Sequence, residues 1–178
     1  EKVTDAEVDA LMAEYAEKYT FATDNTEAVR YQAKEEIAIE KFMKARGFTA
    51  FHTNFEDLQG LKQLPGLASQ DLMEKGYGFG AEGDWKSAAL YRTVWVMNQG
   101  LPRGCSFLED YTLNFDGANS SILQSHMLEI CPLIAAAKPK LEVHFLGIGI
   151  RKTPTARLVF TSKTGPGCTA TVVDLGNR

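Results

Sequence analysis

The sequence predicts an α/β unit followed by a mainly antiparallel β-rich unit. Residues 4–19 carry apolar side chains at helical spacing, and residues 27–46 are bounded by helix-start and helix-stop residues. Residues 48–52 are a short aromatic and β-branched run. From Cys105 onward, apolar side chains recur with a period of two. A helix followed by a strand is typical of an α/β layer, whereas successive alternating strands are typical of antiparallel sheets. We therefore expect an α/β unit over residues 1–103 and a β-rich unit over residues 104–178.

The composition is that of an ordinary globular chain and narrows the expected partners. Of its 178 residues 44% are hydrophobic and 24% charged, with a net charge of −4. There is no basic patch, RNA-binding motif or zinc-finger spacing, so we expect no nucleic-acid partner. No apolar run approaches the ~20 residues of a membrane-spanning helix, so we expect no membrane partner. Three widely spaced cysteines, Cys105, Cys131 and Cys168, indicate reduced thiols that pack as small apolar side chains.

Helix ends are marked by capping residues. Thr4-Asp-Ala-Glu7 is a capping box, in which two side chains satisfy two otherwise unpaired backbone N–H groups. For the helix over 27–46, Thr26 is the expected N-cap and Gly47 the expected stop. A short helix is predicted over 68–75. Apolar side chains surround the helix predicted over 84–99 on nearly all sides, which predicts that it is buried.

A glycine-rich stretch over residues 76–86 contains the acid Glu82. A carboxylate in such a stretch indicates a tight backbone bend that presents it. Residues 78–83 also match the G-x-G-x-x-G pattern of dinucleotide-binding folds. The pattern is expected directly after a hydrophobic strand, whereas here a short helix precedes it, and Glu82 would repel a pyrophosphate. A nucleotide-binding oxidoreductase is therefore the less favoured alternative.

Two predicted strands in the β-rich unit carry an ionisable group in a largely apolar row. One row is Phe107, Glu109, Tyr111 and Leu113, and the other is Ile122, Gln124, His126, Leu128 and Ile130. Glu109 could instead face water at a sheet edge, and His126 alone could be a hydrogen-bonded core histidine. An isolated buried carboxylate costs several kcal/mol unless a counter-charge, hydrogen bonds or a metal offset it. Taken with Glu82, the two groups predict one site assembled from three segments.

The rest of the β-rich unit is predicted to contain a third strand and a hairpin. The third strand covers residues 141–148, and the hairpin joins residues 157–161 to 168–174 around the turn at 164–167. Both ends of the chain look cut, so we expect it to belong to a longer protein.

The three predicted site residues suit a divalent cation. Two carboxylates and an imidazole are hard or borderline ligands, which favour Mn²⁺, Mg²⁺, Fe²⁺ or Zn²⁺. Three ligands leave coordination positions open for a substrate such as a polyol. A carboxylate could then move a proton while the metal polarises a carbonyl. Phe55, in the loop over 53–66, is either a core plug or a wall of this site.

Seven segments carry distinctive motifs: KQLPG at 62–66, LMEKGYGFGAEGDWK at 72–86, SFLEDYT at 106–112, SHMLEICP at 125–132, LGIG at 146–149, ARLVF at 156–160 and DLGNR at 174–178. In these segments, across essentially its whole length, the chain resembles the L-arabinose isomerase family. The resemblance implies the later half of a Rossmann-like central α/β domain, followed by the first part of a β-rich C-terminal domain.

The same resemblance implies a function. Members interconvert L-arabinose and L-ribulose, and many also convert D-galactose to D-tagatose, as cytoplasmic Mn²⁺-dependent homohexamers. Matching positions imply Glu82, Glu109 and His126 as metal ligands, with a second His expected beyond residue 178. Glu82 and Glu109 would also pass a proton between C1 and C2 through a cis-enediol, while Phe55 and Met127 would contact the sugar. The alternative is a catalytically inactive fragment or structural module of such an enzyme.

Overall fold

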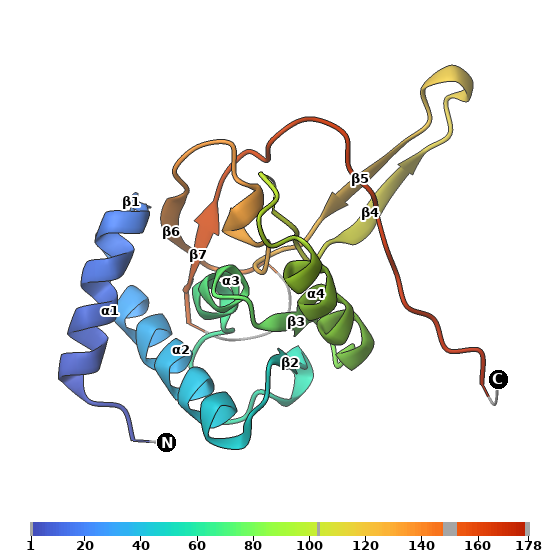
Figure 1. Ribbon diagram of the computed structural model, residues 1–178. Helices are drawn as coiled ribbons and strands as arrows, with labels where there is room; N and C mark the ends of the chain where they lie inside the picture. The colour runs from blue at the N-terminus through green and yellow to red at the C-terminus, as the bar shows by residue number, and fades with distance from the viewer. Residues whose placement is uncertain (1, 103, 148–152, 177–178) are drawn as a thin grey trace.

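The computed structural model describes residues 2–102, 104–147 and 153–176. A β-hairpin projects away from the rest of the molecule (Figure 1). Within the described ranges no helix combines the length and apolarity needed to cross a membrane. The α-helices are α1 (Asp5–Lys18), α2 (Thr26–Arg46), α3 (Gly66–Glu74) and α4 (Trp85–Met97).

The strands form small sheets, and antiparallel pairs make up most of the pairing among the described residues. One sheet has the order β1-β6-β7, in which β6 runs parallel to β1 and antiparallel to β7. A second sheet pairs β2 with β3 in parallel, and a third pairs β4 with β5 as an antiparallel hairpin. The predicted mixed α/β character is confirmed. The strand bounds are β1 Thr20–Phe21, β2 Ala50–His52, β3 Gly78–Gly80, β4 Glu109–Asn114, β5 Ser121–Ser125, β6 Lys140–His144 and β7 Thr155–Val159.

The capping residues act largely as predicted. The capping box at Thr4 and Glu7 is present at the start of α1. Gly47 ends α2 in the left-handed region at φ 69°, where glycine lacks the steric cost of a Cβ. The prediction for the start of α2 was wrong by one residue. Asn25 is the N-cap, because its side chain accepts a hydrogen bond from the backbone N–H of Ala28.

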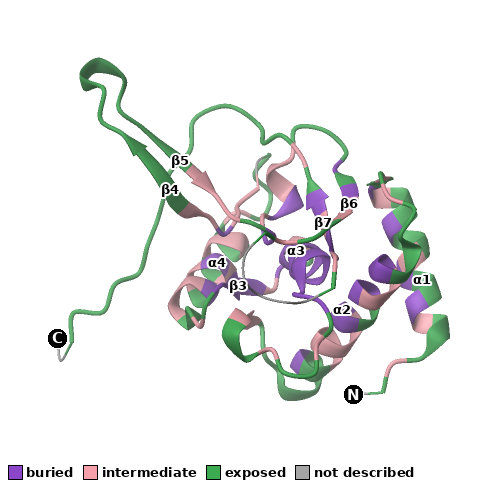
Figure 2. Cartoon of the chain, turned by 180° about the vertical axis from the view of Figure 1, so that it is seen from behind, coloured by how far each residue is buried: buried purple, intermediate pink, exposed green. Residues whose placement is uncertain are grey.

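The larger hydrophobic core contains side chains from both early and late segments of the sequence. Val8, Leu11 and Tyr15 of α1 pack with side chains of α2 and with Leu141 and Leu158 from β6 and β7. The short helix α3 lies at the centre and is buried along nearly its whole length (Figure 2). Residues before and after position 103 therefore share one core. The boundary expected there stays a prediction, and residue 103 itself lies outside the described residues.

The smaller core sits under α4 and includes Phe79, Tyr91 and Phe107. Helix α4 lies so close to β3 that a Cβ added at Gly80 would come within 2.0 Å of the Asp84 carbonyl oxygen. The prediction that α4 is buried on nearly all sides was wrong. Only Ala88 and Tyr91 are buried, and Trp85 and Met97 are 64% and 75% exposed. Its apolar composition reflects one packed face and an apolar outer surface.

Strand pairing also departs from simple alternation. The register of the β4–β5 hairpin shifts between Asp110 and Thr112, so Leu113 does not continue the row of Glu109. The bulge arises because one extra residue, Tyr111, opposes no partner. Strand β5 ends at Ser125, and His126 follows it rather than lying within it.

The predicted hairpin near the end of the chain was wrong. Strand β7 pairs with β6, and residues 163–176 form an exposed extended arm that contains no strand. Asp174 on this arm makes an ion pair with Lys86 of α4. Cys131 is buried and Cys105 partly buried, as expected, whereas Cys168 on the arm is exposed. The third predicted strand is β6, which ends at His144; residues 148–152 lie outside the described residues.

Candidate functional site

A small pocket brings together four of the five predicted site residues. Phe55, Glu82, His126 and Met127 line it, together with Glu129 and the neighbouring side chains of Thr53, Leu58, Leu64, Pro65, Ala81 and Leu128. Its free volume is about 30 Å³, which is room for about one water molecule rather than a sugar. A larger open depression of about 420 Å³ near the start of α2 contains none of the predicted site residues.

Glu82 sits on the tight turn that joins β3 to α4. Its φ is 54°, and among the described residues it is the one non-glycine residue with positive φ. The turn is held by hydrogen bonds from the N–H of Gly83 to the Thr53 carbonyl and from the N–H of Asp84 to the Ala81 carbonyl. Non-glycine residues in this region of backbone space cluster at functional sites. The predicted tight bend at Glu82 is therefore confirmed.

His126 is held by an aromatic chain. Its ring packs edge-on against Phe107, with centroids 5.2 Å apart, and Phe107 packs in the same way on Phe79 of β3. The His126 side chain is only 8% exposed. Its Nε2 lies 3.7 Å from Oε1 of Glu109, and its Nδ1 lies 2.6 Å from Oε2 of Glu129. The ring thus presents one nitrogen to each of two carboxylates.

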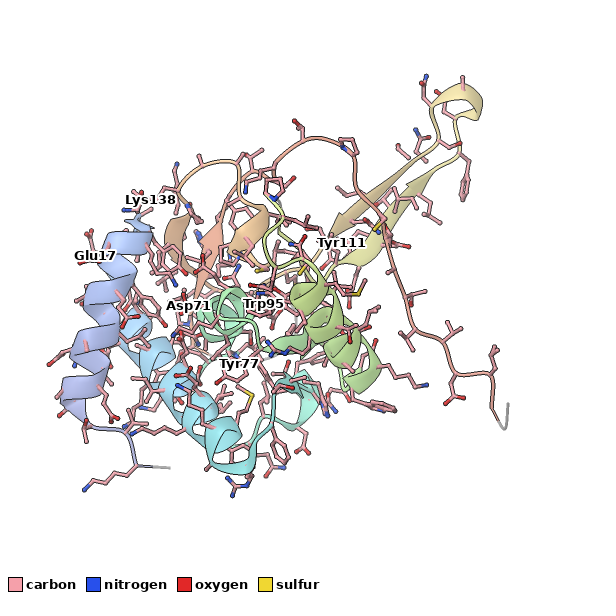
Figure 3. All side chains as sticks on the ribbon, viewed as in Figure 1. Glu17, Asp71, Tyr77, Trp95, Tyr111 and Lys138 are labelled. Carbon is pink, nitrogen blue, oxygen red and sulfur yellow. The ribbon has the colours of Figure 1, made fainter. Side chains whose placement is uncertain are left out.

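Glu109 begins β4 and pairs with Ser125 of β5. This pair lies at the base of the projecting β4–β5 hairpin, near the place where Figure 3 labels Tyr111. Its side chain is 37% exposed, so it faces the site from a partly open position. Burial raises the pKa of Glu109, His126 lowers it, and the carboxylates of Glu82 and Glu129 raise it further, leaving it above its ordinary value. Glu109 is therefore close enough to Glu82 and His126 for their charges to shift its pKa.

The electrostatic balance of this cluster is acidic. Burial alone would lower the pKa of His126, but Glu129, Glu109 and Glu82 together raise it above its ordinary value. Among the described residues, no Lys or Arg forms an ion pair with any of these three carboxylates. The imidazole is the only group shown to offset their charge in the described part of the chain.

The two predicted substrate residues lie at the rim. Phe55 starts a single turn of 3-10 helix and is partly buried, so it forms a wall of the pocket rather than a core plug. Met127 is 39% exposed, and its backbone carbonyl accepts a hydrogen bond from Nη1 of Arg157. Both line the pocket.

The donor atoms suit a divalent cation, although they do not form a closed shell. In the part of the chain that is described, no three His, Cys, Asp or Glu side chains lie close enough to hold a metal ion as they stand. Carboxylate and imidazole are nevertheless the ligand types that Mn²⁺ accepts, and no Lys or Arg of the described ranges makes an ion pair with the cluster. The residues present therefore fit such an ion, provided that their side chains draw together around it.

Sequence reasoning gave no role to Glu129. It is 5% exposed and contacts His126, three positions before it in the chain. The available signal was an acid between Leu128 and Ile130, in a run that otherwise reads as apolar.

The G-x-G-x-x-G pattern of residues 78–83 has a packing explanation. A Cβ at Gly78 would come within 2.1 Å of the Ala88 carbonyl, so the glycines allow α4 to approach β3.

The structure is a mixed α/β fold in which carboxylates and an imidazole lie close together at a small pocket, and these are groups that can take part in proton transfer. Comparison with protein families identifies residues 1–100 as an L-arabinose isomerase central domain and residues 104–178 as an L-arabinose isomerase C-terminal domain. The chain belongs to the L-arabinose isomerase family.

Individual relatives agree with this assignment. The chain is 68% identical over 188 residues to the L-arabinose isomerase of Bacteroides thetaiotaomicron and 66% identical to that of Phocaeicola vulgatus. It is 54% identical over 178 residues to that of Thermotoga petrophila. Each match covers 99% of this chain but only 36–37% of the relative. The chain thus spans little more than a third of the length of these curated relatives.

Proposed function

We propose that this chain supplies part of the active site of an aldose–ketose isomerase that interconverts L-arabinose and L-ribulose. D-galactose and D-tagatose are the second proposed substrate pair. The observation that carries the proposal is that Glu82 and His126, from separate segments, line one small pocket, while Glu109 from a third segment lies 3.7 Å from His126. Family membership supports the choice of reaction, since the relatives are named for it.

In this proposal Glu82, Glu109 and His126 hold Mn²⁺, which when bound supplies Lewis-acid polarisation of the sugar carbonyl. Glu82 and Glu109 carry the proton transfer. One carboxylate removes the proton from C2 while the carbonyl oxygen on C1 takes up a proton, giving a cis-enediol. The C2 hydroxyl then loses its proton as C1 takes one up, so that the carbonyl ends on C2. The rigid turn holds Glu82 in place, and Phe55 and Met127 border the sugar and limit the access of water.

The remaining expectations are part of the same proposal. Residues 1–103 would complete a Rossmann-like central domain, and residues 104–178 would begin the C-terminal domain. A second His from beyond residue 178 would be the fourth ligand. The pocket described here holds about one water molecule, so we propose turnover for the full-length protein, as a cytoplasmic homohexamer, rather than for these residues alone.

The experiment is to measure isomerisation of L-arabinose by the full-length protein and by its Glu82→Gln and Glu109→Gln variants. Each variant should lose at least about 100-fold in kcat, because each removes a group that moves a proton. The matched control is Glu142→Gln, which alters an exposed Glu–His contact on β6 and should leave kcat unchanged. More than a tenth of normal activity in either site variant would contradict the proposed roles.

A further inference from the structure

We infer that Glu129 is the positioning residue of His126, holding the imidazole so that Nε2 faces Glu109. This inference rests on the proposed function, because a defined Nε2 matters only if that nitrogen binds a ligand. It adds a buried carboxylate to a site whose two other carboxylates are more exposed.

The side chains of His126 and Glu129 make a close polar contact. Nδ1 of His126 lies 2.6 Å from Oε2 of Glu129, and the two side chains are 8% and 6% exposed. Both atoms are buried, and neither forms a hydrogen bond of regular geometry with any partner. The contact is therefore the one close polar interaction that the described structure gives to either atom.

The chemistry of the pair selects one tautomer. An ionised carboxylate only accepts hydrogen bonds, so Glu129 favours a proton on Nδ1. The Nε2 atom, which lies 3.7 Å from Oε1 of Glu109, then keeps its lone pair for a cation. The other tautomer would point an N–H at the carboxylates and leave no lone pair on the side of the site. A carboxylate behind a ligating histidine commonly has this effect.

Packing limits the alternatives open to the ring. The edge-on contact with Phe107, at an interplanar angle of 79°, leaves His126 little freedom to tilt. With the ring plane set by Phe107 and one nitrogen set by Glu129, Nε2 has one direction to face. Glu129 would therefore act through His126 and would not touch the sugar.

The test uses the full-length protein and Mn²⁺ binding followed by electron paramagnetic resonance. Glu129→Gln keeps the shape of the side chain, but its amide can donate as well as accept, so it no longer selects the tautomer. We expect Mn²⁺ affinity to fall about 10–100-fold, while kcat at saturating Mn²⁺ stays within about threefold of wild type. The control is Glu142→Gln, because Oε2 of Glu142 lies 2.6 Å from Nε2 of His144 at an exposed position. This control should bind Mn²⁺ as the wild type does.

Two results would overturn the inference. One is Mn²⁺ affinity in Glu129→Gln equal to that of the wild type. The other is loss of kcat at saturating Mn²⁺, which would make Glu129 a group that contacts the substrate. Wild-type protein that neither binds Mn²⁺ nor isomerises the sugar would instead refute the proposed function. The melting temperature of the metal-free protein checks folding. If the Gln variant misfolds, Glu129→Asp, which withdraws the carboxylate by one methylene, should weaken Mn²⁺ binding, and unchanged affinity there would refute the inference.

Discussion

Two clusters of acidic side chains in this molecule are built in opposite ways. The interhelix cluster lies between α1, α2 and α3, where Figure 3 labels Asp71, and comprises Tyr15, Lys18, Tyr19, Glu36, Asp71, Glu74 and Lys75. The site cluster comprises Glu82, Glu109, His126 and Glu129. Lysines neutralise the first, whereas the second has no lysine or arginine ion pair among the described residues.

The interhelix cluster shows how this chain balances buried charge. Asp71 is fully buried and contacts Lys18 at 2.6 Å and Lys75 at 3.0 Å. Burial alone would raise the pKa of Asp71, but Lys75 and Lys18 lower it to about 2. Burial and the adjacent Asp71 raise the pKa of Glu36, which also accepts a hydrogen bond from the hydroxyl of Tyr15. The two lysines therefore favour the ionised form of Asp71.

The difference indicates what each cluster is for. Charges that are paired within the chain serve folding, because each is stabilised before any ligand arrives. Charges that gather without a cation raise the free energy of the free protein, and a bound cation would lower it. In the site cluster the positions are set by the backbone turn at Glu82 and by the aromatic contact at His126 instead. We propose that the site cluster, in which no Lys or Arg of the described residues pairs with a carboxylate, binds a cation.

The largest expected effect compares Asp71→Asn with Glu109→Gln, both measured by denaturant unfolding of the metal-free full-length protein. Asp71→Asn should lower the free energy of unfolding by about 3 kcal/mol, because it removes the charge that neutralises two lysines. This is the lower end of the ~3–5 kcal/mol typical of breaking a buried ion pair. The loss is no larger because Lys18 keeps Glu74, and Lys75 keeps Glu36, as a partner. Glu109→Gln should cost less than about 0.5 kcal/mol or be stabilising, since it relieves repulsion. Equal losses in both would remove the contrast between the clusters.

The next effect tests whether the backbone holds Glu82. Gly80→Ala should destabilise the protein by about 1–3 kcal/mol and lower activity, since its Cβ would meet the Asp84 carbonyl at 2.0 Å. Gly83→Ala is the matched control, because no atom lies within 4 Å of its added Cβ and only its positive φ is penalised. It should cost about 1 kcal/mol. Thermal unfolding and kcat report both changes, and a Gly80→Ala variant that behaves like Gly83→Ala would argue against this framework.

The smallest effect is a difference in acid sensitivity. The pKa of Asp71 falls from 3.8 to about 2 on folding, so its ionised form adds stability above pH 4. That contribution disappears as pH falls through about 2, and it amounts to at most about 2 kcal/mol. The stability gap between wild type and Asp71→Asn should therefore shrink between pH 5 and pH 2. A gap that stays constant in denaturant unfolding would show that the charge of Asp71 is not what stabilises the cluster.

Local sequence signals predicted features that depend on contacts between residues close together in the chain, such as helix ends and tight turns. Thr4 and Glu7 form the capping box, Gly47 ends α2, and the glycine stretch bends tightly at Glu82. Long-range pairing was not predictable in the same way. The parallel contact of β1 with β6 joins residues 20–21 to 140–141, and nothing local in either segment encodes that partner.

The site shows the same division. Glu82, Glu109 and His126 were predicted because each is a polar group in an unusual local setting, and their roles stay predictions. The bulge at Tyr111 was missed, since a period-two pattern does not reveal one extra residue. Glu129 was missed because its importance lies in the 2.6 Å contact with His126, which only the folded backbone creates. An acid in an apolar run, three residues from a histidine, is the signal to use in related sequences.

The measurement that tests the cation-site claim most directly is a Mn²⁺ titration of the full-length wild type beside Glu109→Ala, with Asp71→Asn as the control from the other cluster. The wild type and the Asp71→Asn control should bind one Mn²⁺ per chain in a saturable manner, whereas Glu109→Ala should lose this binding. Binding that persists unchanged in Glu109→Ala, or that is absent from the wild type, would contradict the account.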